Sequence, residues 1–375
     1  MKWSWRIGRL LGIDVYMHAT FLILLLWLGV SYYLPQHRMA DVINGLTLIV
    51  ALFGIVILHE MGHALTARRF GIRTRDITLL PIGGVARLER MPEDPKQELL
   101  VALAGPAVNV VLAGVFLLAI LLTGTVLTVP DSRLAGGSFL SNLMWINVSL
   151  AVFNMVPAFP MDGGRVLRAL LAMRLDYVHA TQRAASTGQA LALVFGLVGL
   201  FYNPFLVFIA LFVWMGAAAE SSMVQIKSAL AGIPVSKAMI KDFRSLAPGN
   251  SLQEAIEHVL AGFQHDFPVL EHGRLVGVLT RDDLLKSLAL SGPHTLVAAT
   301  MTERFETGDP ADMLDLVLAR LQSCRCRTLL VLKGGELVGI LTMDNVGEFL
   351  MFQSALRGDA RAGRIGMAAR PARVF

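Results

Sequence analysis

Residues 43–67 read INGLTLIVALFGIVILHEMGHALTA, an apolar run that ends in two histidines and a glutamate. Its length and composition predict a helix that crosses a lipid bilayer. His59 and His63 are four positions apart, so both imidazoles project from one helix face and can bind one zinc ion. Glu60, beside the first histidine, is placed to take a proton from a water molecule at such a site. Because ionisable side chains are costly inside an apolar span, the motif indicates a functional site rather than a chance match.

The composition divides the chain into two parts. Hydrophobic residues make up 55% of the chain and charged residues 16%, whereas soluble domains carry about 25% charged residues. Residues 1–226 contain 28 charged residues, and the 149 residues that follow contain 33. We therefore expect a polytopic α-helical membrane domain of about six transmembrane helices at 1–226, followed by a soluble α/β part. A purely cytosolic enzyme and a disordered protein are excluded.

Six apolar segments are candidate spans: 18–34, 43–67, 99–122, 139–157, 187–201 and 204–219. The last two are short and are separated by Tyr202-Asn203-Pro204, which allows either a tight helical hairpin or one long kinked helix. Basic residues gather before the first span, after the second and after the fourth, the last group being Arg165, Arg168, Arg174 and Arg183. Only one basic residue lies between the first two spans and only one between the third and fourth.

This charge pattern places the N-terminus, the 68–98 loop and the 162–186 loop in the cytoplasm. A cytoplasmic C-terminal part then requires an even number of spans, so we predict six spans and the hairpin, in a multi-pass protein of the cell membrane. The net charge of +5 fits basic cytoplasmic loops better than nucleic-acid binding, and no nucleic-acid partner is expected.

A zinc site needs a third protein ligand, for which the membrane domain offers few candidates. His18 lies in the first span. Asp162 lies just past the fourth span, in NMVPAFPMDGG at 154–164, on the same side as the two histidines. The prolines interrupt a regular helix, and the glycines permit a tight turn that would aim the Asp162 carboxylate inward. An aspartate before a helix is equally typical of a helix N-cap, and spacing alone leaves the two roles open.

Together these motifs resemble the site-2 proteases, which are intramembrane zinc metalloproteases of the M50 type. The resemblance rests on HEMGH at 59–63, on Gly105-Pro106 with Asn109, and on NMVPAFPMDGG at 154–164, in that order. It implies a zinc metalloendopeptidase that hydrolyses peptide bonds in or near transmembrane segments of membrane proteins, as in regulated intramembrane proteolysis. Single-pass proteins in the lipid bilayer, such as an anti-sigma factor or a signalling precursor, are the implied substrates.

The resemblance also implies roles for individual residues. One Zn2+ per chain is held by His59, His63 and Asp162, and Glu60 is the catalytic base. Asn154 is implied to donate a hydrogen bond to the substrate backbone or to the oxyanion, with a buried packing amide as the alternative. The segment with Asn109 is more typical of helix packing than of chemistry.

Residues 79–88 read as strand, glycine turn and strand. In the family a similar hairpin enters the membrane and pairs with an unwound substrate strand. An ordinary cytoplasmic hairpin is the equal alternative.

The soluble part contains an internal repeat with an offset of 62 residues. VGVLTRDD at 276–283 recurs as VGILTMDN at 338–345. Each copy predicts a helix (252–262; 311–322), a strand (267–271; 328–332), a second strand (275–279; 337–341) and a helix. A copy of this size buries little core alone, so we expect the two copies to pack together.

The repeat resembles a pair of CBS domains, at 227–290 and 291–352, followed by a basic and disordered tail at 353–375. The family often binds adenine nucleotides between its copies, which implies ATP, ADP or AMP as a ligand and regulator here. The implied ribose and phosphate contacts are Thr280 with Asp283 and Thr342 with Asn345, although simple capping of the next helix is the alternative. CBS pairs often dimerise, so a homodimer is expected.

A CBS-gated channel or transporter is the alternative function, because CBS pairs also occur on such proteins. It would use the intramembrane ionisable residues as an ion path. A histidine pair at i and i+4 with a distal aspartate suits one zinc ion better than a conduction row.

Overall fold

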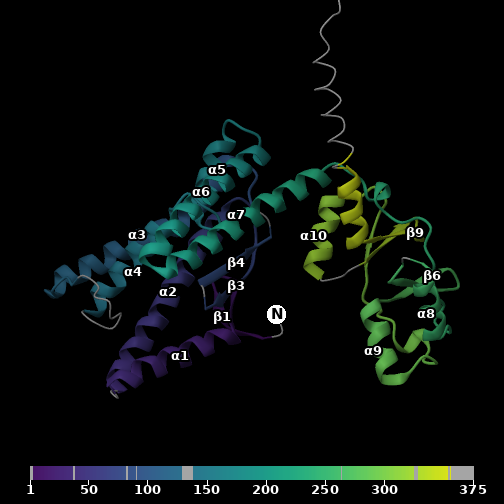
Figure 1. Ribbon diagram of the computed structural model, residues 1–375, viewed down its shortest axis with the longest axis horizontal. Helices are drawn as coiled ribbons and strands as arrows, with labels where there is room; N and C mark the ends of the chain where they lie inside the picture. Colours follow the sequence, from purple (N-terminus) through teal and green to yellow (C-terminus); the bar gives the residue numbers. More distant parts are fainter. Residues whose placement is uncertain are drawn as a thin grey trace, which may run out of the picture. The chain divides into compact units, whose positions relative to one another are not determined.

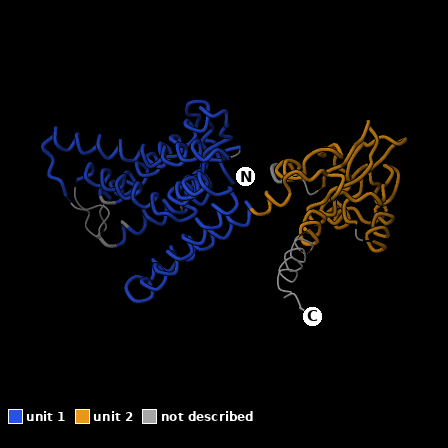
Figure 2. Tube along the Cα trace, turned by 90° about the horizontal axis from the view of Figure 1, so that it is seen from above, with its two compact units in different colours: residues 1–224 blue, residues 225–375 orange. Residues whose placement is uncertain are grey.

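The computed structural model describes residues 3–36, 39–81, 83–89, 91–128, 138–262, 264–324, 328–353 and 355. The chain divides into two compact units, Met1–Val224 and Gln225–Phe375 (Figure 2). The predicted domain limits at 226, 290 and 352 stay proposals. Apart from residues 353 and 355, the predicted tail lies outside the described residues.

The first unit is built mainly of helices, and each of the six predicted apolar segments is helical over most of its length (Figure 1). His18 lies in a strand and residues 155–157 follow the end of a helix, so the predictions of His18 in the first span and of a fourth segment reaching 157 are wrong. The helices are α1 (Ala19–Gln36), α2 (Met39–Arg69), α3 (Pro95–Thr123), α4 (Phe139–Asn154), α5 (Asp162–Ala172), α6 (Tyr177–Tyr202) and α7 (Pro204–Leu230). Four of them, α2, α3, α6 and α7, are long and apolar enough to cross a membrane, whereas the apolar parts of α1 and α4 are shorter. The chain is therefore a membrane protein, and the number of six spans stays a proposal.

The hairpin prediction for the last two apolar segments is confirmed. The chain leaves the helical conformation at Asn203, between α6 and α7. Small residues bring the two helices together, since a Cβ on Gly199 would lie 2.8 Å from the backbone nitrogen of Val207. The α7 helix runs 11 residues past the predicted limit at 219, because hydropathy detects only the apolar part of a helix that continues with polar residues.

A four-stranded sheet accompanies these helices, in the order β1 (Ser4–Leu10), β2 (Ile13–His18), β3 (Thr74–Leu80) and β4 (Gly83–Leu88). The predicted hairpin at 79–88 is confirmed as the antiparallel pair β3–β4. The hairpin β1–β2 is absent from the sequence predictions. It turns through Leu11 and Gly12, both with positive φ, which suits a two-residue hairpin turn.

The second unit contains the repeat. The first copy comprises α8 (Leu252–Leu260), β5 (Phe267–Glu271), β6 (Arg274–Leu279) and α9 (Arg281–Ser291); the second comprises β7 (Glu306–Gly308), α10 (Leu314–Cys324), β8 (Thr328–Lys333) and β9 (Glu336–Thr342), with residues 343–353 helical. Both hairpins have the same register, including a bulge after Val269 in one and after Val331 in the other.

The segment that leads into each copy pairs with the other copy. Ile240 bridges Ile340, and its equivalent Thr302 bridges Val278. In the same exchanged way, a Cβ on Gly339 would lie 2.8 Å from the sulfur of Met239, and one on Gly277 would lie 2.8 Å from the sulfur of Met301. The two copies are therefore interlocked, as their small size led us to expect.

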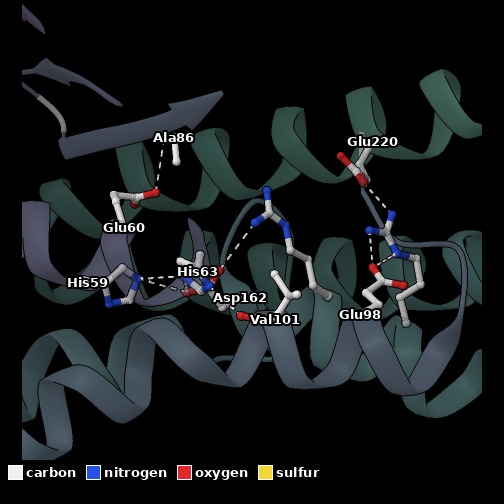
Figure 3. Close-up of polar contacts among 10 residues, drawn as sticks. His59, Glu60, His63, Ala86, Glu98, Val101, Asp162 and Glu220 are labelled. Atoms are coloured by element: carbon white, nitrogen blue, oxygen red, sulfur yellow. Dashed lines mark hydrogen bonds and ion pairs between the residues drawn. The ribbon is translucent and has the colours of Figure 1, made fainter. Parts of the chain in front are cut away.

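A buried ion pair fixes α5 in the first unit. Arg168 has no exposed surface, and its Nε donates to Oε1 of Glu98 in α3 at 2.7 Å. Its Nη1 donates to Oε1 of Glu220 in α7 at 2.5 Å (Figure 3). Arg168 follows the fourth predicted span, and these two carboxylates hold it inside the protein. The predicted cytoplasmic position of the 162–186 loop stays a proposal.

We expect Arg168→Met to destabilise the protein by about 3–5 kcal/mol, because it leaves the buried Glu98 carboxylate without its counter-charge. Thermal unfolding in detergent measures the change. The exposed Arg174 lies two residues beyond α5, and Arg174→Met serves as the matched control. Adding Glu98→Gln to Arg168→Met should restore part of the loss. Equal unfolding temperatures for Arg168→Met and the control would contradict this account.

Candidate metal centre

Three side chains converge in the first unit. The Nε2 atoms of His59 and His63 lie 3.2 and 3.1 Å from Oδ2 of Asp162, and 3.1 Å from each other. All three residues are buried, with exposed fractions of 6%, 4% and 6%. Figure 3 shows both imidazoles turned toward the carboxylate. The i, i+4 spacing on α2 and the position of Asp162 therefore bring three candidate ligand atoms to one point.

The chain between α4 and α5 delivers Asp162 to this point. The N-cap of α5 is Met161, and Asp162 is the first residue of the helix, so the alternative role of Asp162 as the N-cap is wrong. The two glycines that follow allow close contact with the preceding loop. A Cβ on Gly164 would lie 2.6 Å from the backbone nitrogen of Phe159, and one on Gly163 would meet the Val156 carbonyl.

The donor set fits a zinc ion. Catalytic zinc sites use three protein ligands from histidine and acidic residues, at about 2.0–2.2 Å from the metal. Tetrahedral ligands at that distance lie about 3.3 Å from one another, close to the separations of 3.1 and 3.2 Å found here. The Nδ1 of His63 lies 2.7 Å from the Val101 carbonyl. The carbonyl can accept a hydrogen bond from Nδ1–H, which leaves Nε2 free to bind metal.

The Asp162 carboxyl favours its ionised form. Burial alone would raise its pKa, but the neighbouring imidazoles of His59 and His63 and the charge of Arg165 lower the pKa below its usual range. The nearest guanidinium nitrogen of Arg165 lies 3.6 Å from Oδ1. An ionised carboxylate is the form that binds a metal.

Glu60 turns away from this cluster toward the sheet. Its Oε2 accepts a hydrogen bond from the backbone nitrogen of Ala86 in β4 at 3.2 Å (Figure 3). A Cβ on Gly84 would lie 3.1 Å from Cγ of Glu60. The glutamate therefore lies between the histidine pair and the last strand of the sheet.

Two other candidates lie apart from the cluster. Asn154 is the last residue of α4, and its amide donates to the Leu150 carbonyl at 3.0 Å. His18, at the end of β2, places its Nδ1 2.8 Å from the Thr20 hydroxyl. Within the described part of the chain, neither residue has a hydrogen bond to the two histidines or to Asp162.

In the second unit, the candidate nucleotide contacts bond to each other. The Thr280 hydroxyl donates to the Asp283 carboxylate at 2.6 Å and accepts from the Asp283 backbone nitrogen at 3.2 Å. Thr280 thereby caps the N-terminus of α9. Thr342 and Asn345 pair in the same way before the last helical segment. These contacts are those of the capping alternative, and nucleotide binding stays a proposal.

Sequence reasoning missed two groups that support the cluster. The Val101 carbonyl belongs to the backbone, so no residue type could mark it. Glu98 lies just before the third predicted span, where a single carboxylate gave no sign of its distant partner Arg168. Asn109 was singled out, but as a packing residue.

Comparisons with known proteins match both units. The profile of peptidase family M50 matches residues 47–132 and 126–199, and the CBS domain profile matches residues 235–290. The chain is 31% identical over 348 residues to zinc metalloprotease MJ0392 of Methanocaldococcus jannaschii, covering 92% of this chain and 96% of the relative. It is 29% identical over 367 residues to Rip3 of Mycobacterium tuberculosis, covering 92% of each chain.

Among solved structures, the site-2 protease from Methanocaldococcus jannaschii aligns with a TM-score of 0.44 and 36% identity, covering 58% of this chain and 95% of that chain. The relatives that match over nearly the whole length carry the name zinc metalloprotease, and zinc is the metal that the family implies for the His/His/Asp cluster. The chain is therefore a zinc metalloprotease of peptidase family M50, the site-2 protease family, and it carries a CBS domain.

Proposed function

We propose that this enzyme hydrolyses peptide bonds in or near transmembrane segments of single-pass membrane proteins. The observation that carries the proposal is that Asp162, at the start of α5, meets His59 and His63 of α2. The α2 helix is long and apolar enough to cross a membrane. Donors buried among apolar helices suit a substrate that reaches the site from the bilayer. An anti-sigma factor or a signalling precursor fits this class of substrate.

The three converging side chains would hold one zinc ion. When bound, the ion supplies a Lewis acid that polarises the peptide carbonyl and acidifies water. Glu60 takes a proton from a water molecule while the oxygen of that water bonds to the carbonyl carbon of the peptide. The carbon–nitrogen bond then breaks, and Glu60 passes the proton to the leaving amine. The Ala86 N–H holds the Glu60 carboxylate at 3.2 Å, beside the histidine pair.

The sheet supports a way to present the substrate. A transmembrane helix hides its peptide bonds in its own hydrogen bonds, so hydrolysis needs an unwound segment. The last strand in the order β1-β2-β3-β4 is β4, and its Ala86 contacts Glu60. An extended substrate segment added along β4 would lie next to the catalytic base, as in strand addition by other peptide-binding proteins.

Asn154 would complete the site by donating its amide to the substrate backbone or to the developing oxyanion. Its amide is engaged with the Leu150 carbonyl one helical turn away. Rotation of the side chain on substrate binding would therefore be needed for this role.

The proposed setting is the cytoplasmic membrane, with six spans and with the N-terminus and the CBS pair in the cytoplasm. The charge asymmetry of the loops supports this orientation, without a contribution from the buried Arg168. The CBS pair is proposed as a regulator that responds to an adenine nucleotide through Thr280, Asp283, Thr342 and Asn345, and a homodimer is proposed as the assembly.

The arrangement of ionisable residues weighs against the alternative of a channel or transporter. A conduction path needs polar groups spaced along a membrane. His59, His63 and Asp162 instead meet within 4.8 Å of one another, which favours hydrolysis at one metal ion.

We expect Glu60→Gln to reduce cleavage by roughly 100-fold to 10,000-fold, because glutamine cannot accept the proton. Full-length enzyme is co-expressed with tagged single-pass membrane proteins, and the fragments are sized and mapped. The exposed Glu89 lies just after β4, and Glu89→Gln should cleave at the wild-type rate. Wild-type cleavage by Glu60→Gln would refute the assigned base, and cleavage confined to soluble regions would refute the intramembrane site.

We expect ATP, ADP or AMP to change the cleavage rate of the wild type, and Asp283→Asn to weaken that response, because it removes the carboxylate proposed to contact the ribose. Cleavage rates at several nucleotide concentrations measure the effect. The exposed Glu336 begins the far strand of the second hairpin, and Glu336→Gln is the control. A wild type whose rate is unchanged by all three nucleotides speaks against regulation through the CBS pair.

A further inference from the structure

A chain of buried polar side chains links His59 to α4. The Nδ1 of His59 contacts Oδ1 of Asn109 in α3. The Nδ2 of Asn109 donates to Oδ1 of Asn147 in α4 at 3.0 Å, and Nδ2 of Asn147 donates to the Leu143 carbonyl at 2.8 Å. Neither asparagine has exposed surface. Each polar atom in this series of side chains therefore depends on its neighbour for a hydrogen bond.

The Leu143 carbonyl, at the far end of this series of hydrogen bonds, sets the direction of every bond in the series. A backbone carbonyl only accepts hydrogen bonds, so Asn147 must turn its NH2 group toward Leu143. This leaves the Asn147 oxygen for the NH2 group of Asn109, and the Asn109 oxygen for His59. An oxygen that accepts from His59 requires the imidazole proton on Nδ1. The free lone pair is then on Nε2, the atom that lies 3.2 Å from Asp162.

His63 reaches the same tautomer directly, through the Val101 carbonyl at 2.7 Å. Val101, Gly105 and Asn109 are spaced by four residues, so they share one face of α3. The middle residue makes room for both imidazoles, because a Cβ on Gly105 would lie 2.7 Å from Nε2 of His59 and closer still to His63. This face of α3 therefore supplies a hydrogen-bond acceptor to each histidine, and Gly105 leaves space for both imidazoles between the two acceptors.

We infer that Asn109 and Asn147 are positioning residues that hold the proton of His59 on Nδ1 and so keep its Nε2 available to zinc. This inference rests on the proposed zinc site. Partners of this kind fix the orientation and the tautomer of metal-binding histidines. Asn147 lies in α4 and does not touch His59 itself, so it acts on His59 through Asn109. The segment from Gly105 to Asn109 then supports the metal site and is not only a helix-packing device.

Zinc affinity of the full-length protein tests the inference, measured in detergent by competition with a chromogenic chelator. Asn147→Leu keeps the size of the side chain and removes both of its hydrogen bonds. We expect about tenfold weaker zinc binding for Asn147→Leu and about 10-fold to 100-fold weaker binding for Asn109→Leu. Asn109→Asp keeps an oxygen for His59 and should bind zinc within a few-fold of the wild type.

Ser141 provides the control. It is fully buried in the same helix, α4, and its hydroxyl accepts from the backbone nitrogen of Thr128 at 3.3 Å. Ser141→Ala removes a buried polar partner that takes no part in the series of hydrogen bonds leading to His59. We expect a lower unfolding temperature and unchanged zinc affinity for this variant.

The outcomes separate the inference from the zinc site itself. If the wild type binds zinc and Asn147→Leu binds it equally well, the positioning role is overturned and the zinc site stands. If Asn147→Leu fails to fold, the two Asn109 variants decide, because equal affinities for Asn109→Leu and Asn109→Asp would also overturn the role. A wild type that binds no zinc would overturn the zinc site and the inference together.

Discussion

Two histidines and an aspartate lie together among helices made mostly of apolar residues, and the rest of the first unit is arranged around them. Polar and charged groups removed from water cost free energy unless each has a partner. The Nε2 atoms of both histidines face the Asp162 carboxylate, and each Nδ1 has an oxygen acceptor from α3. The cluster is therefore satisfied on its outer side and open to a metal ion on its inner side.

Neighbouring elements hold the groups that act at this centre. The buried Arg168 ties α5, the helix that begins with Asp162, to Glu98 of α3 and Glu220 of α7. The sheet contributes through β4, where the Ala86 N–H holds Glu60. Elements from distant parts of the sequence thus converge on one site, and each supplies a contact that the apolar helices alone would lack.

Local periodicity explains which parts could be predicted from the sequence. Six apolar segments predicted six helices, the spacing of His59 and His63 predicted a shared face, and the 62-residue offset predicted two similar copies. Contacts between helices have no such local pattern. The acceptors on α3, the partners of Arg168 and the pairing of β2 with β3 depend on which elements meet in space. For the same reason the spacing could not decide between a metal ligand and an N-cap for Asp162. In the structure Met161 is the N-cap of α5, and Asp162 faces the two histidines.

The central claim is that His59, His63 and Asp162 form a site for one zinc ion in which Glu60 takes no part as a ligand. Zinc content per chain of the purified full-length protein in detergent tests it most directly, with wild type, Asp162→Ala and Glu60→Gln prepared in parallel. The account expects about one zinc per chain in wild type and in Glu60→Gln, and little in Asp162→Ala, because catalytic zinc needs three protein ligands. Folded wild-type protein without zinc, or full zinc content in Asp162→Ala, would contradict it.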